Sequence, residues 1–338
     1  MRKRIILLGG TVLALLALMA GGGLAYLYLR RPAQAPPARI QVAITTARLA
    51  RGKYLFEILC NCGHCHSLRD FTRFDGPEVE SGRGQGNIFP EELGLPGQVV
   101  APNITPDPET GLGRWSDGEK IRAIREGVDR EGRALFPFMP YPFYRYMSDE
   151  DVESLVAYLK ELKPIHNPLP RTRLRFPVNL FVKSAPQPAG SVPPPDRVDR
   201  LKYGEYLVRL GGCMDCHTPL ENGRPAEDKL LAGGREFRMP YGYVVSANIT
   251  PHDSGIGPWG ERQFLNKFAE YRDYAANGPP KASPASFTLM PWLSFSQLPE
   301  DDLSAIFAFL KAQKPVRNHV DSHPGAPKTS ARLMPAYR

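Results

Sequence analysis

"CNCGHCH", residues Cys60 to His66, gathers 3 of the 5 cysteines and 2 of the 7 histidines of a chain of 338 residues. Within it, Cys62, Cys65 and His66 form the pattern C-x-x-C-H. On a helix, residues three and four apart are neighbours, so these three side chains are expected on one face. What this face holds decides the fold and the chemistry of the chain.

The pattern occurs again as Cys213, Cys216 and His217, and the sequence around it recurs too. His217 follows His66 by 151 residues, and Pro315 follows Pro164 by the same number. Two domains of one fold are the natural interpretation. The other recurring pairs are "NITPDPETGLGRW" (103–115) with "NITPHDSGIGPW" (248–259), "FMPYPF" (138–143) with "LMPWLSF" (289–295), and Gly-x-Tyr-Leu at 52–55 with the same motif at 204–207.

Each C-x-x-C-H motif predicts a covalently attached haem. Two thiols three residues apart can reach the two vinyl groups of one porphyrin, while the adjacent histidine comes up beneath the iron. Two covalently bound haem c groups are therefore expected. Their proximal ligands are His66 and His217, and their attachment cysteines are Cys62 and Cys65, and Cys213 and Cys216.

Three rival interpretations explain the repeat less well. A structural zinc site could use Cys60 together with the first motif, but Gly211 and Gly212 precede the second, so each copy would need a different solution. A redox-active dithiol belongs at a strand-to-helix turn in an α/β pattern, which is not visible. A disulfide within each pair is sterically poor inside a helix and leaves the histidines unexplained. Cys60 is interpreted as a buried bystander thiol.

The repeat also nominates the sixth iron ligands. Met139 lies 73 residues after His66, and Met290 lies 73 residues after His217. A lone methionine is more often a packing residue, but identical spacing favours ligation, and the other histidines do not recur. Histidine–methionine ligation raises the reduction potential. Two such six-coordinate haems can pass electrons singly but cannot readily bind a substrate at iron.

The two Asn-Ile-Thr-Pro segments leave two alternatives open. Asn103 and Trp115, with Asn248 and Trp259, could donate hydrogen bonds to haem propionates. They could equally be residues that only fix the fold of a turn.

The N-terminus predicts a membrane anchor over residues 1–31. Arg2, Lys3 and Arg4 precede an uncharged run from Ile5 to Leu29, and about 20 apolar residues suffice to span a bilayer. The positive-inside rule keeps the basic start in the cytoplasm. The rest of the chain is then exported to the periplasmic side of a bacterial inner membrane. The alternative is a signal peptide cleaved near "AQA" (33–35).

The remaining chain divides into a spacer (32–44), domain 1 (45–182), a Pro-rich linker (183–197), domain 2 (198–320) and a tail (321–338). Both domains are expected to be all-α, without strands. Predicted helices cover 49–59 and 199–210, and further helices begin at the capping box of Ser116, at the N-cap Ser148 and near Pro299. The Gly-rich loops 67–102 and 219–246 are long enough to wrap a ligand.

Charge narrows the partners. The formal net charge is +8, with 42% hydrophobic and 23% charged residues, but no basic stripe is interleaved with aromatics. Nucleic acid is therefore not expected as a partner. An acidic protein or an anionic membrane surface fits better, and much of the charge is ordinary solvated surface.

These motifs resemble the membrane-bound multi-haem cytochrome c subunits of periplasmic dehydrogenases, which are built from class I cytochrome c domains. The resemblance covers roughly residues 45–170 and 198–320 and rests on "CGHCH", "CMDCH", the "NITPDPETGLGRWS" stretch and "FPFMPYPF". Such subunits usually have three haems and a C-terminal anchor. This chain has two C-x-x-C-H motifs, and its predicted anchor is N-terminal.

The resemblance implies a membrane-tethered di-haem electron carrier and not an enzyme in its own right. Its donor would be a dehydrogenase or quinol-oxidising complex, and its acceptor a terminal oxidase or soluble cytochrome. The alternative is a di-haem enzyme, of peroxidase or thiosulfate-oxidising type, with one haem open at its sixth position.

Overall fold

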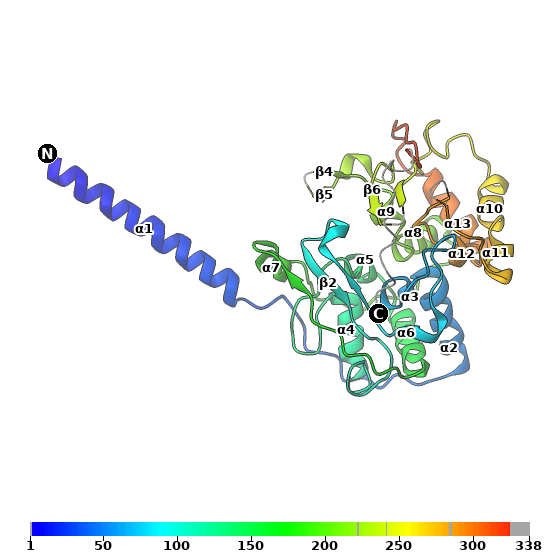
Figure 1. The fold of residues 1–338 in the computed structure, drawn as a ribbon, viewed down its shortest axis with the longest axis horizontal. Coiled ribbons are helices and arrows are strands. Elements are labelled where there is room, and N and C mark those ends of the chain that lie inside the picture. Colours follow the sequence, from blue (N-terminus) through cyan, green and yellow to red (C-terminus); the bar gives the residue numbers. More distant parts are fainter. Residues whose placement is uncertain (1, 222, 241, 284–285, 325–338) are drawn as a thin grey trace.

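The structure is a computed structural model that describes residues 2–221, 223–240, 242–283 and 286–324. One long helix, α1 (Arg2–Leu29), projects from a body of short helices and loops (Figure 1). The expected tail is described only as far as residue 324, and Met334 lies outside the described residues.

The elements of the first half follow α1 along the chain. They are α2 (Thr46–Lys53), the π-helix η1 (Tyr54–Leu59), α3 (Cys62–His66), η2 (Glu80–Gly82), β1 (Asn87–Phe89), η3 (Glu91–Leu93), β2 (Gly97–Ala101), α4 (Asp117–Glu126), α5 (Tyr141–Tyr144), α6 (Asp149–Glu161), β3 (Arg173–Leu174), α7 (Val178–Phe181) and η4 (Val182–Ser184).

The second half repeats this order of helices and adds α11 between the counterparts of α4 and α5. Its elements are α8 (Arg200–Leu210), α9 (Cys213–Cys216), β4 (Leu220–Glu221), β5 (Arg224–Pro225), η5 (Glu227–Lys229), β6 (Glu236–Met239), β7 (Gly242–Val245), α10 (Glu261–Ala269), α11 (Arg272–Asn277), α12 (Trp292–Phe295) and α13 (Glu300–Lys311).

Local sequence signals account for the starts of two long helices of the first half. The Ser116 hydroxyl accepts from the backbone N–H of Glu119, whose carboxylate accepts from the Ser116 N–H, so the predicted capping box of α4 is confirmed. Ser148 caps α6 through the N–H of Asp151, as expected. The apolar faces of the last helices are buried as predicted, with side chains 0–8% exposed at Val152, Leu155, Val156 and Leu159 of α6 and at Leu303, Ile306, Phe307 and Leu310 of α13.

The Gly-x-Tyr-Leu motif sets the helix crossing in each half. A Cβ at Gly52 would lie 2.1 Å from the Ser154 carbonyl oxygen, and one at Gly204 would lie 2.0 Å from that of Ala305. Only glycine lets the backbones of α2 and α6, and of α8 and α13, approach so closely. Leu55 and Leu207, the last residues of the motif, are both 0% exposed in one core cluster to which both halves contribute.

A one-residue difference between the repeats appears as a π-turn. Cys62 lies ten positions after Gly52, but Cys213 lies nine positions after Gly204. The first half absorbs the extra residue in η1, where the Cys60 N–H donates to the Leu55 carbonyl five residues back. Such π-turns are the usual way for a helix to accommodate one inserted residue, and Cys62 keeps its place at the start of α3.

Reciprocal hydrogen bonds join the two halves. The Tyr54 hydroxyl donates to Asp302 Oδ2 of α13 at 2.5 Å, and the Tyr206 hydroxyl donates to Asp151 Oδ2 of α6 at 2.5 Å. Both tyrosines belong to Gly-x-Tyr-Leu, and the two aspartates are 151 residues apart. Each half therefore offers its tyrosine to the aspartate of the other, as in a two-fold symmetric interface.

The expectation of a fold without strands is wrong. The loops expected to be irregular contain short antiparallel pairs, with Ile88 opposite Val100 in β1–β2 and Phe237 opposite Val244 in β6–β7. β3 extends the first pair, since Gly97 lies opposite Leu174. These strands have two to five residues, too few for an alternating pattern to stand out, and their pairing saturates the backbone of long loops. The fold remains mostly helical.

Candidate haem-attachment sites

Each C-x-x-C-H motif begins a short helix after a left-handed residue. Asn61 precedes α3 with φ 49°, and Gly212 precedes α9 with φ 71°. This conformation ends the preceding long helix and lets a new one start at once in another direction. Glycine adopts it without cost, whereas Asn61 tolerates it with its side-chain amide donating to the Ile58 carbonyl at 2.8 Å.

The two histidines make the same orienting contact. His66 Nδ1 lies 2.7 Å from the Pro102 carbonyl oxygen, and His217 Nδ1 lies 2.7 Å from that of Ala247. A carbonyl only accepts, so Nδ1 carries the proton and Nε2 keeps its lone pair for a metal. Sequence reasoning missed these two carbonyls, although both immediately precede Asn-Ile-Thr-Pro.

The Asn-Ile-Thr-Pro loops hold those carbonyls in place. The side-chain oxygen of Asn103 accepts from the N–H and the hydroxyl of Thr105 at 3.0 and 2.7 Å, and its nitrogen donates to the Ile165 carbonyl at 2.7 Å. In the second half, Asn248 makes the same bonds to Thr250 and to the Val316 carbonyl.

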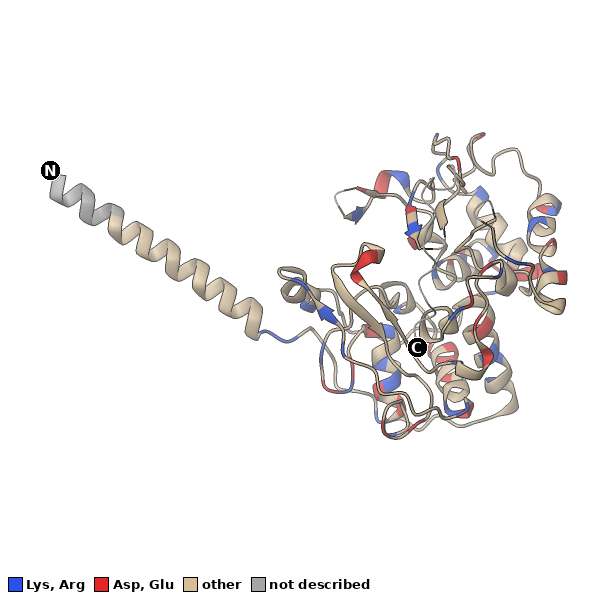
Figure 2. Ribbon diagram, in the orientation of Figure 1, with Lys and Arg blue, Asp and Glu red and all other residues tan. Residues whose placement is uncertain are grey.

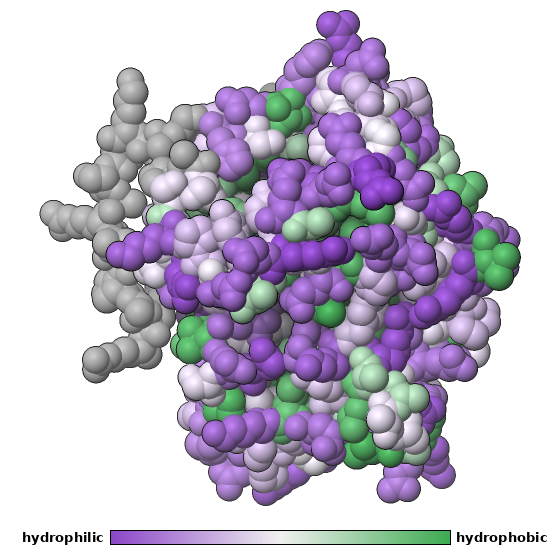
Figure 3. Space-filling view, turned by 90° about the vertical axis from the view of Figure 1, so that its right-hand side faces the viewer, coloured by the Kyte–Doolittle hydropathy of each residue, from purple (hydrophilic) through white to green (hydrophobic). Residues whose placement is uncertain are grey.

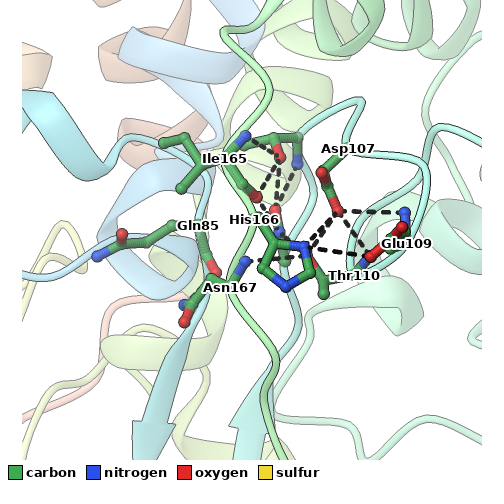
Figure 4. Close-up of polar contacts among 9 residues, drawn as sticks. Gln85, Asp107, Glu109, Thr110, Ile165, His166 and Asn167 are labelled. Carbon is green, nitrogen blue, oxygen red and sulfur yellow. Dashed lines mark hydrogen bonds and ion pairs between the residues drawn. The ribbon is translucent and has the colours of Figure 1, made fainter.

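Figure 4 shows the first loop closing around Thr110, whose N–H donates to Asp107 Oδ1 at 2.7 Å. His166 lies beside this turn, with Nδ1 3.7 Å from carboxylate oxygens of both Asp107 and Glu109. The asparagine side chains are thus used within the loop, which favours the fold role over propionate binding. Trp115 and Trp259 are both half-buried.

The two methionine loops are also alike. The N–H of Tyr141 donates to the Met139 carbonyl at 2.8 Å, and that of Trp292 to the Met290 carbonyl at 2.8 Å, at the start of α5 and α12. Met139, Met290, Cys62 and Cys213 all pack against the one core cluster. The structure therefore brings these four predicted residues to the same core, while their roles as iron ligands and attachment points remain predictions.

The state of the thiols argues against the rival chemistries. All five cysteines lie in the described part of the chain and are free. Burial raises the pKa of Cys60 and Cys213 to about 12, and it also raises the pKa of Cys62 and Cys65. A redox-active dithiol needs the opposite shift. Among the described residues, no three or more His, Cys, Asp and Glu side chains are arranged as metal ligands.

The donor set that remains fits haem. In each half, two thiols lie on one short helix against a largely apolar core, and the histidine is the last residue of α3 or directly follows α9. Burial lowers the pKa of both histidines, which keeps the imidazoles neutral as iron ligation requires. The loops after them, expected to wrap a ligand, supply the carbonyls that orient them.

Comparison with known proteins agrees with this assignment. The family model described as cytochrome c matches residues 49–163. A protein named "Diheme cytochrome c-type" from Cereibacter sphaeroides is 31% identical over 304 residues, which cover 88% of this chain and 95% of that protein. The chain belongs to the cytochrome c family, whose members carry covalent haem c, and it is an electron-transfer protein.

Dehydrogenase subunits are also similar. One subunit of the nicotinate dehydrogenase of Pseudomonas putida is 32% identical over 83% of this chain, and the fructose dehydrogenase cytochrome subunit of Gluconobacter japonicus is 31% identical over 78%. The chain covers 23% of the first of these proteins and 52% of the second. Both are named as subunits of dehydrogenases, and the second is named as a cytochrome subunit.

Proposed function

We propose that this protein is a membrane-tethered, periplasmic di-haem cytochrome that passes single electrons from a dehydrogenase or respiratory donor to a terminal oxidase or soluble cytochrome. Two tandem class I domains, 45–182 and 198–320, each carry one haem c. The observation that carries the proposal is the matched contact of His66 and His217, each 2.7 Å from the carbonyl before Asn-Ile-Thr-Pro.

The roles of the chain's own residues follow from this match. Cys62 and Cys65, and Cys213 and Cys216, form the thioether links. His66 and His217 present Nε2 to iron because Nδ1 is held by a carbonyl. Met139 and Met290 would supply thioether sulfurs as the sixth iron ligands, which would favour the ferrous state. When bound, each haem would accept and release one electron reversibly.

The packing of the two attachment helices supports transfer between the haems. Cys62 of the first motif and Cys213 of the second pack against the same core cluster. The reciprocal Tyr–Asp bonds fix this arrangement.

The membrane anchor is supported by α1. Its stretch Gly10–Leu29 has a mean hydropathy of 2.0 and is 0% buried in the protein, which suits lipid contact.

The cytochrome c subunit of a quinone-dependent alcohol dehydrogenase from Komagataeibacter europaeus is 29% identical over 85% of this chain. By analogy, a dehydrogenase or a quinol-oxidising complex is the proposed donor.

The test is an anaerobic titration of the full-length reduced protein in lipid nanodiscs. We expect ferricyanide to remove two electrons per chain, and carbon monoxide to leave both ferrous haem spectra unchanged because both irons are six-coordinate. A single electron per chain would contradict the proposal. A carbon monoxide shift in half of the haem, with turnover of hydrogen peroxide, would instead identify a di-haem enzyme.

A further inference from the structure

The short helix α7 lies against the end of the long helix α1, at its C-terminal foot (Figure 1). Between them is an apolar groove of about 500 Å³, with Leu24, Tyr28 and Leu29 on one side and Phe176 and Leu180 on the other. The candidate membrane span ends at Leu29. The segment around α7 is therefore level with the place where the chain leaves the apolar part of a bilayer.

Aromatic side chains at this place are unusually exposed. Phe176 is 71% exposed and Phe181 is 54% exposed, although Leu180 between them is 4% exposed and anchors α7 to the first half. Exposed aromatic rings next to a membrane span are typical of the bilayer interface. The face turned away from α1 differs, since Figure 3 shows it mostly hydrophilic with apolar residues scattered among polar ones.

Polar contacts tie this segment to the helix. Lys183 Nζ donates to the Tyr28 carbonyl at 2.5 Å and lies 5.6 Å from the centre of the Tyr28 ring. The Arg30 guanidinium donates to the Ser184 hydroxyl. The last turn of α1 is thus joined to η4, directly after α7.

The charges around the foot of α1 are mainly basic, as Figure 2 shows at the strand and loop beside it. Glu91 of η3 forms an ion pair with Arg175 and neutralises that basic charge. Glu92 is the other acidic residue of η3. The remaining basic side chains near the end of the anchor and around α7 favour anionic headgroups. These residues are Arg30, Arg31, Arg171, Arg173 and Lys183.

The spacer does not act as a free tether. Pro32 is buried, the Val42 N–H donates to Asp117 Oδ2 at 2.8 Å, and Lys160 Nζ donates to the Val42 carbonyl at 3.1 Å. A Cβ at Gly118 would lie 2.0 Å from the Ala38 carbonyl oxygen, so the spacer lies directly on α4. Movement of the first half relative to α1 is restricted at both the spacer and α7.

We propose that the Phe176–Phe181 segment is a second membrane contact, which docks into the interface of the bilayer that α1 spans. The two phenylalanines enter the headgroup boundary, the basic side chains meet anionic lipid headgroups, and a lipid acyl chain occupies the groove. The first half is then mounted on the membrane in one orientation, and the second half faces away. This inference rests on the proposed anchor.

Depth measurement on the full-length holoprotein tests the proposal. A nitroxide is attached at Phe181→Cys, and separately at Leu220→Cys, a 45% exposed apolar position of the second half. Both carry Cys60→Ser, and the protein is placed in nanodiscs containing phosphatidylglycerol. We expect the label at 181 to be several-fold more accessible to oxygen, relative to a water-soluble nickel chelate, than the label at 220. Equal, water-like accessibility at both positions overturns the proposal.

Carbonate extraction separates this outcome from failure of the anchor. A protein that resists extraction but has a water-like label at 181 keeps its anchor and lacks the second contact. A protein released by carbonate contradicts the anchor itself, and with it the membrane contact.

A second measurement uses haem orientation. The variant Phe176→Glu/Phe181→Glu is compared with Leu220→Glu by linear dichroism of haem absorption in oriented bilayers. We expect the double variant to lose most of its dichroism with unchanged haem content and spectra, and the control to keep it. Unchanged dichroism in the double variant would contradict an oriented mount.

Discussion

The two halves of the chain differ less in their ligand geometry than in what supports it. Both histidines meet a carbonyl at 2.7 Å. However, His66 is buried and Cys65 is half-buried, whereas His217 is half-buried and Cys216 is exposed. The repeated motif therefore sets the ligand geometry, and the unrepeated surroundings set how each site meets solvent and partner.

The first half also supports the second through a loop that has no counterpart in the repeat. In residues 71–76, the Phe74 N–H donates to the Pro280 carbonyl at 2.8 Å, and the Phe74 ring stacks on Tyr271 at 5.4 Å between centroids. Asp75 Oδ2 accepts from the Leu293 N–H at 2.9 Å, three residues after Met290. The second methionine loop is thus held by the other half of the chain.

The linker adds to the first half as well. The Val192 carbonyl accepts from the Asp149 N–H at 2.9 Å, and the Gly190 carbonyl accepts from Arg125 at 2.6 Å. Spacer and linker therefore both pack on α4 or α6. We conclude that the first half holds the spacer and the linker and also supports the methionine loop of the second half.

The largest expected effect comes from the methionines. Met139→Ala and Met290→Ala should each convert about half of the low-spin haem to high spin and lower one reduction potential, because a thioether favours ferrous iron. Optical and EPR spectra with a redox titration measure this. Met147→Leu, at a fully buried methionine, is the control and should leave both potentials unchanged. Unaltered low-spin spectra in both alanine variants would remove these residues as ligands.

Asp75 tests the support of the second half. Asp75→Ala leaves the Leu293 N–H without its acceptor and should cost about 2 kcal/mol, with the second haem perturbed and the first not. Asp75→Asn keeps an acceptor and is the matched control. Chemical denaturation followed by haem absorption measures the cost. Equal perturbation of both haems would contradict the asymmetric support.

The same residue predicts a pH dependence. Burial raises the pKa of Asp75 from 3.8 to about 7, despite the opposing effect of Arg69. Between these values the folded protein keeps a proton that the unfolded chain releases, so rising pH favours unfolding over this range. Wild type should lose stability relative to Asp75→Asn as the pH rises from about 4 to about 7, and the difference should level off above that. A difference that is constant from pH 5 to 8 would exclude this titration.

The reciprocal tyrosines test the symmetry of the interface. Tyr54→Phe and Tyr206→Phe each remove a buried hydrogen bond to a carboxylate and should each cost about 2 kcal/mol. The Asp302 carboxylate keeps Tyr203 as a donor, and Asp151 keeps Arg51. The Tyr206 hydroxyl also accepts from the Ser148 N–H at 3.1 Å, so Tyr206→Phe should cost somewhat more. Equilibrium unfolding measures them, and Tyr146→Phe, at a 48% exposed position, is the control. A cost confined to one variant would break the symmetry.

The helix caps predict the smallest difference. Ser116→Ala removes the capping box of α4 and should cost about 1 kcal/mol. The equivalent α10 has Gly260 at its N-cap with φ −84° and ψ 162°, and a Cβ there meets nothing within 4 Å. Gly260→Ser, with Gln263 three residues on, should therefore stabilise by a few tenths of a kcal/mol. Thermal unfolding measures both, and a destabilised Gly260→Ser would contradict the comparison.

Local patterns predicted much of this fold from the sequence. Ser116, Ser148 and the apolar faces of α6 and α13 act through neighbours within one or two helical turns, so their signals are visible in any short window. The repeat extended that reach, because Met139 and Met290 stood out only through their equal distance from two motifs. It also indicated which helices of the two halves correspond to each other, without any knowledge of their packing.

The sequence hid the features that depend on distant partners. The strands β1 and β6 are stabilised by pairing and not by their own composition. Asp75 and the carbonyl of Pro102 act on residues 218 and 36 positions away, and the docking of the 71–76 loop occurs in one half only, so the repeat could not indicate it. The exposed Phe176 indicates a membrane contact only because the fold places it next to α1.

The count of covalently bound haem tests the central claim most directly. A pyridine haemochrome assay on the purified full-length protein should give two haems per chain, and one in each of the variants Cys62→Ala/Cys65→Ala and Cys213→Ala/Cys216→Ala. One haem or none in the wild-type protein would contradict a site in each half.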